Sequence, residues 1–308
     1  MGTADFLALL FRFVGDILTL ILLYDFFVQP FRFYGMDPLT RFVWMAARKI
    51  CAPFEAVSRK IIRLPDRDLT PLFTLVMVVV IRGLLYGVCA GPSHPIILFI
   101  GMTLSFQELF TRLLVPGLLF VLYADIQLSR HQETFVGNVL AMLVHDVAKR
   151  FIVTIRRLLP SYRPLHVFIT AFVLLGLFEW LFLVVTLLPF GKSSSFNAFS
   201  PDLIPEALYW LDSSVVVYLL VNVRLAQTFL FGIFILVLMN VLSGFSGLDP
   251  YDRFSIMLGL VISPWLVLSR RLFRFARIGM FDFSIAILLF IPYFVLAILE
   301  ALITRGGT

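Results

Sequence analysis

The sequence is short of charged residues. Only 14% of its 308 residues are Asp, Glu, Lys or Arg, whereas 60% are hydrophobic. A soluble domain of this length carries about 25% charged residues, because its surface must face water. The deficit runs along the whole chain, so a large apolar surface must face something other than water. This composition excludes a soluble enzyme.

Reactive and metal-binding patterns are also scarce. The two cysteines, Cys51 and Cys89, form no CxxC pair, and the four histidines lack metal-ligand spacing. The sequence has no phosphate-binding loop, no dinucleotide fingerprint, no HExxH and no GxSxG pattern. We therefore expect no catalytic residues, no metal and no cofactor, in a protein that is not an enzyme.

Long apolar runs are abundant. A bilayer core of about 30 Å requires roughly 20 predominantly apolar residues of a helix. Six runs of this kind occur, at about 6–30, 69–91, 96–127, 165–188, 207–243 and 281–303. The third and fifth are longer than one perpendicular crossing, so we expect tilt, or a break at Pro116 and at Asp212 respectively. The pattern predicts an all-α polytopic membrane protein with about six transmembrane helices.

Positive charge is concentrated between these runs. Most of the 25 Lys and Arg residues lie in three segments, 32–67, 129–164 and 246–280, whereas the opposite loops contain only Lys192. The positive-inside rule then makes the three segments cytoplasmic and puts both termini on the other side of the inner (cytoplasmic) membrane. Orientation and anionic lipid headgroups explain the net charge of +6, so nucleic acid is not an expected partner.

The same order of segments occurs three times. Each repeat reads span, basic amphipathic segment, span, and we place the repeats at 1–92, 93–190 and 191–308. A basic pair recurs in each, at Arg59-Lys60, Arg156-Arg157 and Arg270-Arg271. The first two repeats also share the spacing of an arginine and an aspartate, Arg12 with Asp25 and Arg112 with Asp125.

The basic segments have the pattern of amphipathic helices. In the second, Leu140, Val144 and Ile155 follow one face and cations occupy much of the rest. Such a helix lies in the membrane interface, with its cations at headgroup phosphates. The third segment is more apolar and is expected to lie deeper; the alternative is a packed helix pair covering the cytoplasmic face. The cations expected to bind lipid headgroups or a partner are Arg48, Lys49, Arg59, Lys60, Lys149, Arg150, Arg156, Arg157, Arg270 and Arg271.

A second group of candidates is the charges within apolar runs: Arg12, Asp16, Asp25, Glu108, Arg112 and Asp125. A charge at mid-bilayer costs roughly 2.5–3.5 kcal/mol, so such residues normally pair or line water. Arg12 with Asp16, and Glu108 with Arg112, have the spacing of neighbours on one helix. The pattern favours local salt bridges that fix helix rotation. The alternatives are an ion or proton pathway through these four residues and contacts with a partner subunit.

Turn, proline and basic-pair motifs precede the final span of two repeats. In the third they are Asp249-Pro250, Ser263-Pro264, Arg270-Arg271 and Phe281-Asp282-Phe283-Ser284. In the first they are Asp37-Pro38, Ala52-Pro53, Arg59-Lys60 and Asp68-Leu69-Thr70-Pro71. This pattern resembles the YggT family of bacterial and chloroplast membrane proteins, known in some lineages as YlmG. The chain departs from that family in having three repeats instead of the usual two.

The resemblance implies a role in membrane organisation, such as cell shape and division, osmotic tolerance, nucleoid distribution in plastids or assembly of photosynthetic complexes. It implies no catalytic residues. We expect a non-enzymatic protein that scaffolds, assembles or organises a larger membrane complex, with anionic lipid and other membrane-protein subunits as partners. The alternatives are a small ion channel or transporter, and an accessory subunit of a respiratory or photosynthetic complex.

Overall fold

Helices make up nearly all of the chain that the computed structural model describes. The described residues are 3–29, 38–61, 68–90, 95–130, 139–158, 163–187, 214–245, 253–278 and 281–305. Within them, five helices are long and apolar enough to cross a membrane: Gly101–Leu128, Pro164–Val185, Val217–Val241, Ser255–Leu272 and Ser284–Leu302. A shorter apolar helix covers Thr70–Leu85. The protein is an all-α polytopic membrane protein, which confirms the class predicted from hydropathy.

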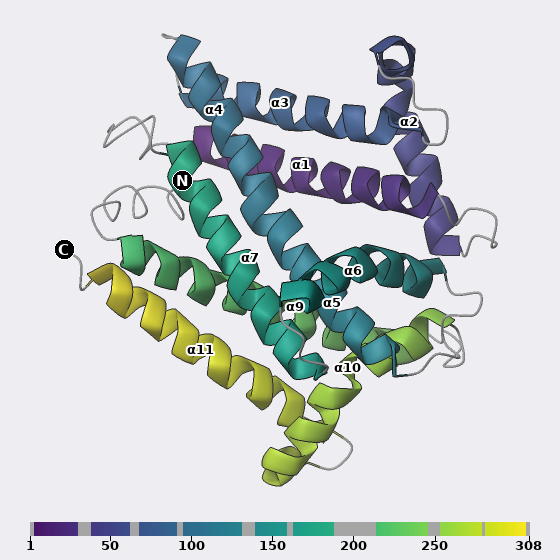
Figure 1. The fold of residues 1–308 in the computed structure, drawn as a ribbon, viewed down its shortest axis with the longest axis vertical. Helices are drawn as coiled ribbons and strands as arrows, with labels where there is room; N and C mark the ends of the chain where they lie inside the picture. The colour runs from purple at the N-terminus through teal and green to yellow at the C-terminus, as the bar shows by residue number, and fades with distance from the viewer. Residues whose placement is uncertain are drawn as a thin grey trace. The chain divides into compact units, whose positions relative to one another are not determined.

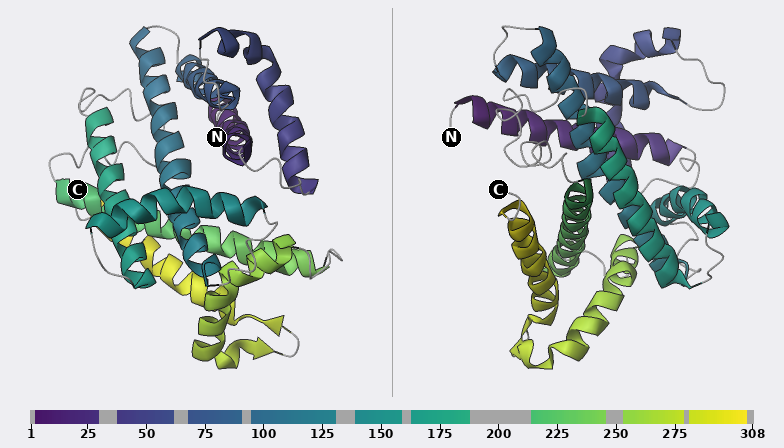
Figure 2. Two further views of the ribbon diagram at one scale, coloured as in Figure 1. Left: turned by 45° about the vertical axis from the view of Figure 1, so that its right-hand side comes forward. Right: turned by 60° about the vertical axis from the view of Figure 1, so that its left-hand side comes forward.

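In each predicted repeat, the helix that carries the basic pair follows one long helix or helical run and precedes another (Figure 1). The first repeat contains α1 (Thr3–Val28), α2 (Pro38–Ile61) and α3 (Thr70–Ala90). The second contains α4 (Pro95–Glu108), η2 (Leu109–Leu114), α5 (Val115–Leu128), α6 (Val139–Leu158) and α7 (Pro164–Leu187). The third contains α9 (Ser214–Phe245), α10 (Arg253–Leu272) and α11 (Ser284–Arg305). The short η7 (Arg274–Ala276) and the hairpin of β1 (Arg277–Ile278) and β2 (Phe281–Asp282) join α10 to α11 (Figure 2, left).

Helix α10 differs most from its expected character. The sequence predicts a basic amphipathic segment at 246–280, yet Ser255–Leu272 is apolar and long enough to cross a membrane. The reason is the position of its charges, because Arg253 begins the helix and Arg270-Arg271 stand in its last turn. The turns between are almost entirely apolar.

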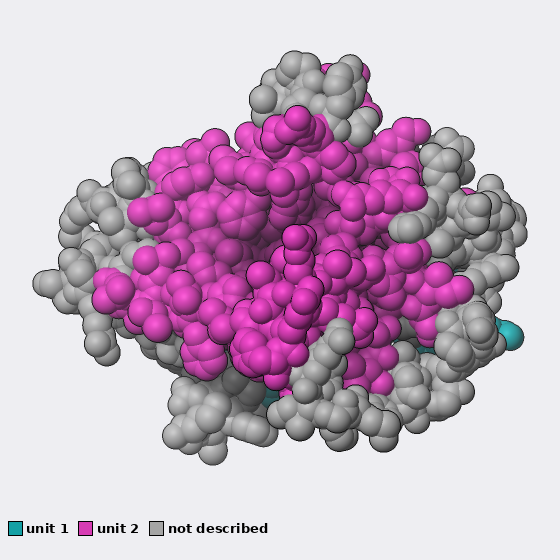
Figure 3. Space-filling model, turned by 90° about the horizontal axis from the view of Figure 1, so that it is seen from below, with its two compact units in different colours: residues 1–114, 186–205 teal, residues 115–185, 206–308 magenta. Residues whose placement is uncertain are grey.

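The chain forms two compact units (Figure 3). Unit 1 comprises Met1–Leu114 with Thr186–Pro205, and unit 2 comprises Val115–Val185 with Glu206–Thr308. The boundary falls at the end of η2, a π-helical segment between α4 and α5. Pro116 follows closely and has no N–H to donate to the carbonyl of Arg112, which accounts for the widened turn. The irregularity lies immediately before the proline at which the sequence predicted a break.

Unit 1 is held together by close helix packing. Helix α3 packs against α1 and α4, and α2 packs against α1 and α3. At Gly83 of α3 a Cβ would lie 2.5 Å from the Cα of Met102, so the backbones of α3 and α4 approach more closely than a side chain allows. Small residues at helix crossings are typical of membrane proteins. The apolar core draws on α1, α2, α3 and η2: Leu22, Cys51, Leu75, Val79 and Leu109.

Unit 2 is centred on four aromatic rings from three helices. The centroids of Phe120, Tyr123, Phe168 and Phe229 lie 5.4–6.4 Å apart. The Tyr123 hydroxyl donates to the carbonyl of Val261 at 3.0 Å, which attaches α10 to this cluster. The spans of α7 and α11, by contrast, are only 28% and 17% buried. Apolar surface of this kind faces lipid or another subunit.

The amphipathic helices are buried at equivalent positions. The buried side chains have the same spacing in each and are followed by the basic pair: Ala47, Cys51 and Ser58 in α2; Val144, Ala148 and Ile155 in α6; Leu258, Ile262 and Ser269 in α10. Pro53 and Pro264 also occupy equivalent places inside α2 and α10. The three helices that carry the basic pairs therefore share the spacing of their buried residues.

The first and third repeats also share a buried hydrogen bond. Ser58 donates to the hydroxyl of Thr70 at 3.2 Å, and Ser284 donates to the hydroxyl of Ser269 at 3.2 Å. Each bond joins the end of an amphipathic helix to the first residue of the next helix. The middle repeat has Ile155 at this place, and that side chain packs in an apolar cluster between α5, α6 and α7.

Candidate functional site

Cations of the amphipathic helices point away from the buried positions. The exposed side chains of the predicted set are Arg48, Lys49, Lys149, Arg150, Arg157, Arg270 and Arg271. Arg59, Lys60 and Arg156 lie in their helices, but their side chains are outside the described residues. Most of the predicted lipid- or partner-binding cations are therefore accessible to an anionic surface.

A buried arginine joins three helices of unit 1. The side chain of Arg82, on α3, is 3% exposed. Its Nη1 donates to Oδ1 of Asp16 on α1 at 2.7 Å. Its Nε and Nη2 donate to the hydroxyl and the carbonyl of Ser105 on α4, at 2.8 and 2.6 Å. Oε2 of Glu108 lies 4.0 Å from Nη2, so the guanidinium sits between two carboxylates.

Asp16 therefore pairs with Arg82, a charge within another apolar run, and not with the partner that its helical spacing predicts. The expected partner was Arg12 on the same helix, whose side chain lies outside the described residues. Gly15 allows the actual contact, because a Cβ there would lie 2.8 Å from Cδ of Arg82. Arg112, half-buried in η2, acts electrostatically on Asp16 as well. Arg82 is the one charged residue in the apolar run 69–91, and that isolation was the available signal.

A similar set of groups lies within unit 2. Nε of Arg224 on α9 donates to Oε1 of Glu300 on α11 at 2.7 Å. Glu179 on α7 is buried and interacts electrostatically with Arg224. Its Oε2 accepts no hydrogen bond from the residues that the structure describes. Each unit therefore contains an arginine near two carboxylic acids from neighbouring helices, so that the buried cation has a counter-charge inside the membrane.

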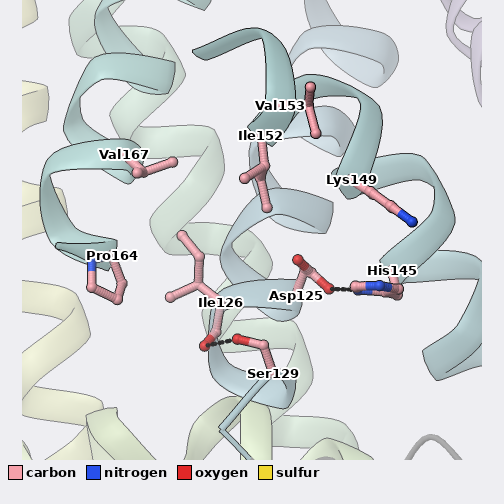
Figure 4. A pocket seen from close by; sticks show the side chains of 9 residues that line it. All are labelled: Asp125, Ile126, Ser129, His145, Lys149, Ile152, Val153, Pro164 and Val167. Carbon is pink, nitrogen blue, oxygen red and sulfur yellow. Dashed lines mark hydrogen bonds and ion pairs between the residues drawn. The ribbon is translucent and has the colours of Figure 1, made fainter. Parts of the chain in front are cut away.

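The two aspartates with shared spacing, Asp25 and Asp125, are both buried near the ends of their helices. Oδ1 of Asp125 lies 2.8 Å from Nδ1 of His145 on α6. The pair borders a cavity of about 290 Å³ between the end of α5, one face of α6 and the start of α7 (Figure 4). Lys149, one turn after His145 on α6, lies at the same cavity. Sequence reasoning named Asp125 and Lys149 separately and did not bring them together.

The described polar groups form ion pairs and not a metal centre. Among the residues placed by the structure, no group of three or more His, Cys, Asp and Glu side chains is arranged to hold a metal ion. The chemistry available is therefore charge pairing inside the helical units and cation presentation on the amphipathic helices. Comparison with the models of known protein families, with curated proteins and with solved structures finds no match to this chain.

Proposed function

We propose that this chain is a non-enzymatic membrane protein that scaffolds, assembles or organises a larger membrane complex. The observation that carries the proposal is the common construction of α2, α6 and α10. In each, buried residues fix one face to the spans, and a basic pair follows the last of them. A cation held on a fixed helix face binds an anionic surface with little loss of freedom.

The intramembrane charges support the same role. Arg82 makes three hydrogen bonds inside unit 1, and Arg224 is bonded to Glu300 in unit 2. Charges engaged in this way hold helices together, whereas a conducting pathway needs groups that exchange partners with water or ions. The exposed apolar faces of α7 and α11 add surface suited to a neighbouring subunit.

The cellular setting belongs to the same proposal. By the positive-inside rule, the basic segments lie on the cytoplasmic side of the inner membrane and both termini lie on the other side, with α10 entering the membrane from the cytoplasmic side without crossing it. The resemblance to the YggT family supports a role in membrane organisation, and the equivalent packing of three amphipathic helices supports three repeats. The partners are anionic phospholipid and other membrane-protein subunits.

The test is extraction of the tagged full-length protein in a mild detergent, followed by native mass determination and identification of co-purifying proteins. The variant Arg48→Gln/Lys49→Gln/Arg270→Gln/Arg271→Gln removes exposed charge from α2 and α10. A matched variant with lysine at the three arginines, and Lys49 unchanged, retains the charge. We expect a stoichiometric complex that the glutamine variant loses and the lysine variant keeps.

A chain that emerges alone contradicts the proposal if it also conducts ions in liposomes. Asp16→Asn then distinguishes the two roles. Under the proposed function this variant changes neither complex formation nor ion leakage. Loss of ion flux in Asp16→Asn would instead establish the channel or transporter reading.

A further inference from the structure

The cavity beside Asp125 and His145 suits a ligand that the proposed function does not specify. We propose that it binds one phospholipid, with the phosphodiester at Lys149 and His145 and the glycerol and first acyl carbons along the apolar wall. The proposal deepens the proposed function and rests on its placement of α6 at the membrane surface. The proposal specifies one bound lipid molecule, whereas the proposed function requires only an anionic membrane surface.

The cavity lies where two membrane spans end. One candidate span finishes at Leu128, beside the lining residue Ser129, and the next begins at the lining residue Pro164. The interface region of a bilayer begins where the apolar length of a spanning helix stops. A cavity between the end of α5 and the start of α7 therefore opens at the depth of phospholipid headgroups.

Its lining has two chemically different sides. Ile126, Ile152 and Val167 point into the cavity from three different helices (Figure 4). His145 and Lys149 stand together on the α6 side. An apolar wall with a cationic rim matches the junction of headgroup and acyl chain, because a phosphodiester needs donors and the carbons beside it need apolar contact.

The charge balance favours an anionic headgroup. Asp125, the acid of the lining, is 5% exposed and is engaged by His145 at 2.8 Å. Lys149 is exposed and provides a cation at the same cavity. Exposed Arg130 and Arg163 adjoin the lining residues Ser129 and Pro164 in sequence and add positive potential around the mouth.

Two neighbouring cations on α6 make a matched experiment possible. Lys149 lines the cavity, whereas Arg150 is 67% exposed and lies 3.8 Å from Asp146 outside the lining. Lys149→Gln and Arg150→Gln remove the same charge from adjacent positions. The full-length protein is purified in a mild detergent with added phosphatidylglycerol, and retained lipid is counted by native mass spectrometry.

We expect Lys149→Gln to weaken phosphatidylglycerol retention about tenfold, as for loss of one charge-assisted hydrogen bond, and Arg150→Gln, which removes only surface charge outside the cavity, to weaken it clearly less. A second variant, Val153→Trp, fills the mouth without changing charge and should also lower retention. Thermal unfolding of each variant shows whether the fold is intact. Unchanged retention in both Lys149→Gln and Val153→Trp would overturn the proposal.

Further outcomes separate this proposal from the proposed function. Equal losses in Lys149→Gln and Arg150→Gln would overturn the cavity site, while leaving general surface attraction in place. Displacement of the lipid by millimolar glycerol phosphate, as effectively as by a short-chain phosphatidylglycerol, would show a site for soluble phosphate esters and also overturn it. If no partner complex is found but the protein still retains the lipid, only the scaffold role is contradicted.

Discussion

Asp16 and Arg82 are 66 residues apart in the chain and are joined at 2.7 Å in unit 1. The contact links α1 to α3, and Ser105 extends it to α4. Arg82 is bonded to Ser105 as well as to Asp16, whereas the described ion pair of Asp16 is the one with Arg82. The two members of the pair therefore do not contribute equally to stability. Removing the arginine takes the bonded counter-charge from Asp16, whereas removing the aspartate leaves the arginine bonded to Ser105.

The first prediction follows from that asymmetry. Arg82→Gln should destabilise the protein by about 3–5 kcal/mol, because it removes the cation bonded to the half-buried Asp16 and close to the buried Glu108. Asp16→Asn should cost clearly less, since Ser105 and Glu108 still surround the guanidinium. Thermal unfolding in detergent measures both, with the exposed Arg41→Gln as control. Equal losses from the two variants would contradict the proposed role of Arg82.

The second prediction concerns the close contact of α3 and α4. Gly83→Ala should lower the melting temperature, because its Cβ meets backbone atoms of Met102 that cannot rotate away. Gly259→Ala is the matched control, since a Cβ there meets nothing within 4 Å. Helix propensity makes the control neutral or slightly stabilising, by up to about 1 kcal/mol. A tolerated Gly83→Ala would show that the backbones are not in contact.

The third prediction tests the shared hydrogen bond of the repeats. Ser58→Ala and Ser269→Ala should each cost about 1–3 kcal/mol, because each leaves a buried hydroxyl without that partner. Replacing both members, as in Ser58→Ala/Thr70→Val, should cost less than the sum of the single changes. Double-mutant cycles on thermal stability measure this. Additive losses would mean that the hydroxyls do not interact.

The fourth prediction concerns Cys51 in α2. Desolvation by burial raises the pKa of its thiol above the usual 9.0, and the nearby carboxylate of Asp25 acts in the same direction. In a Cys89→Ser background, alkylation of Cys51 by iodoacetamide should therefore lag behind a free thiol throughout the alkaline range. As pH rises past 9.0, the thiol loses its proton in the unfolded chain before it does so in the folded protein. The free energy of unfolding therefore decreases over that range. A rate equal to that of a free thiol would contradict the burial.

The fifth prediction separates the two glutamates near Arg224. Glu300→Gln removes the carboxylate bonded at 2.7 Å and should lower the melting temperature. Glu179→Gln should be neutral or stabilising, because the amide removes a charge from a buried site. Both variants keep the side-chain size, so packing is matched. A larger loss from Glu179→Gln would show that this carboxylate is the main partner of Arg224.

The helical class could be predicted because bilayer thickness imposes a length on apolar runs, and the buried faces of α2 and α6 follow helical spacing. The partner of Asp16 could not, since Arg12 and Arg82 are equally suitable in charge and only the packing of α1 on α3 decides between them. Whether α10 is amphipathic or apolar along a membrane-crossing length depends on where its few cations lie along the helix, and the composition of the segment does not show this. The cavity at Asp125 arises from the ends of three helices, and no local spacing encodes that meeting.

The contact between Gly83 and Met102 has a consequence for biosynthesis. Helices α3 and α4 are adjacent in the chain and touch backbone to backbone, so they can leave the insertion machinery as one hairpin. Asp16 has already been made when Arg82 emerges, and Ser105 follows soon afterwards. The guanidinium of Arg82 can then form hydrogen bonds to Asp16 and Ser105 during insertion. Its charge is therefore compensated as α3 enters the bilayer, which lowers the cost of inserting that helix.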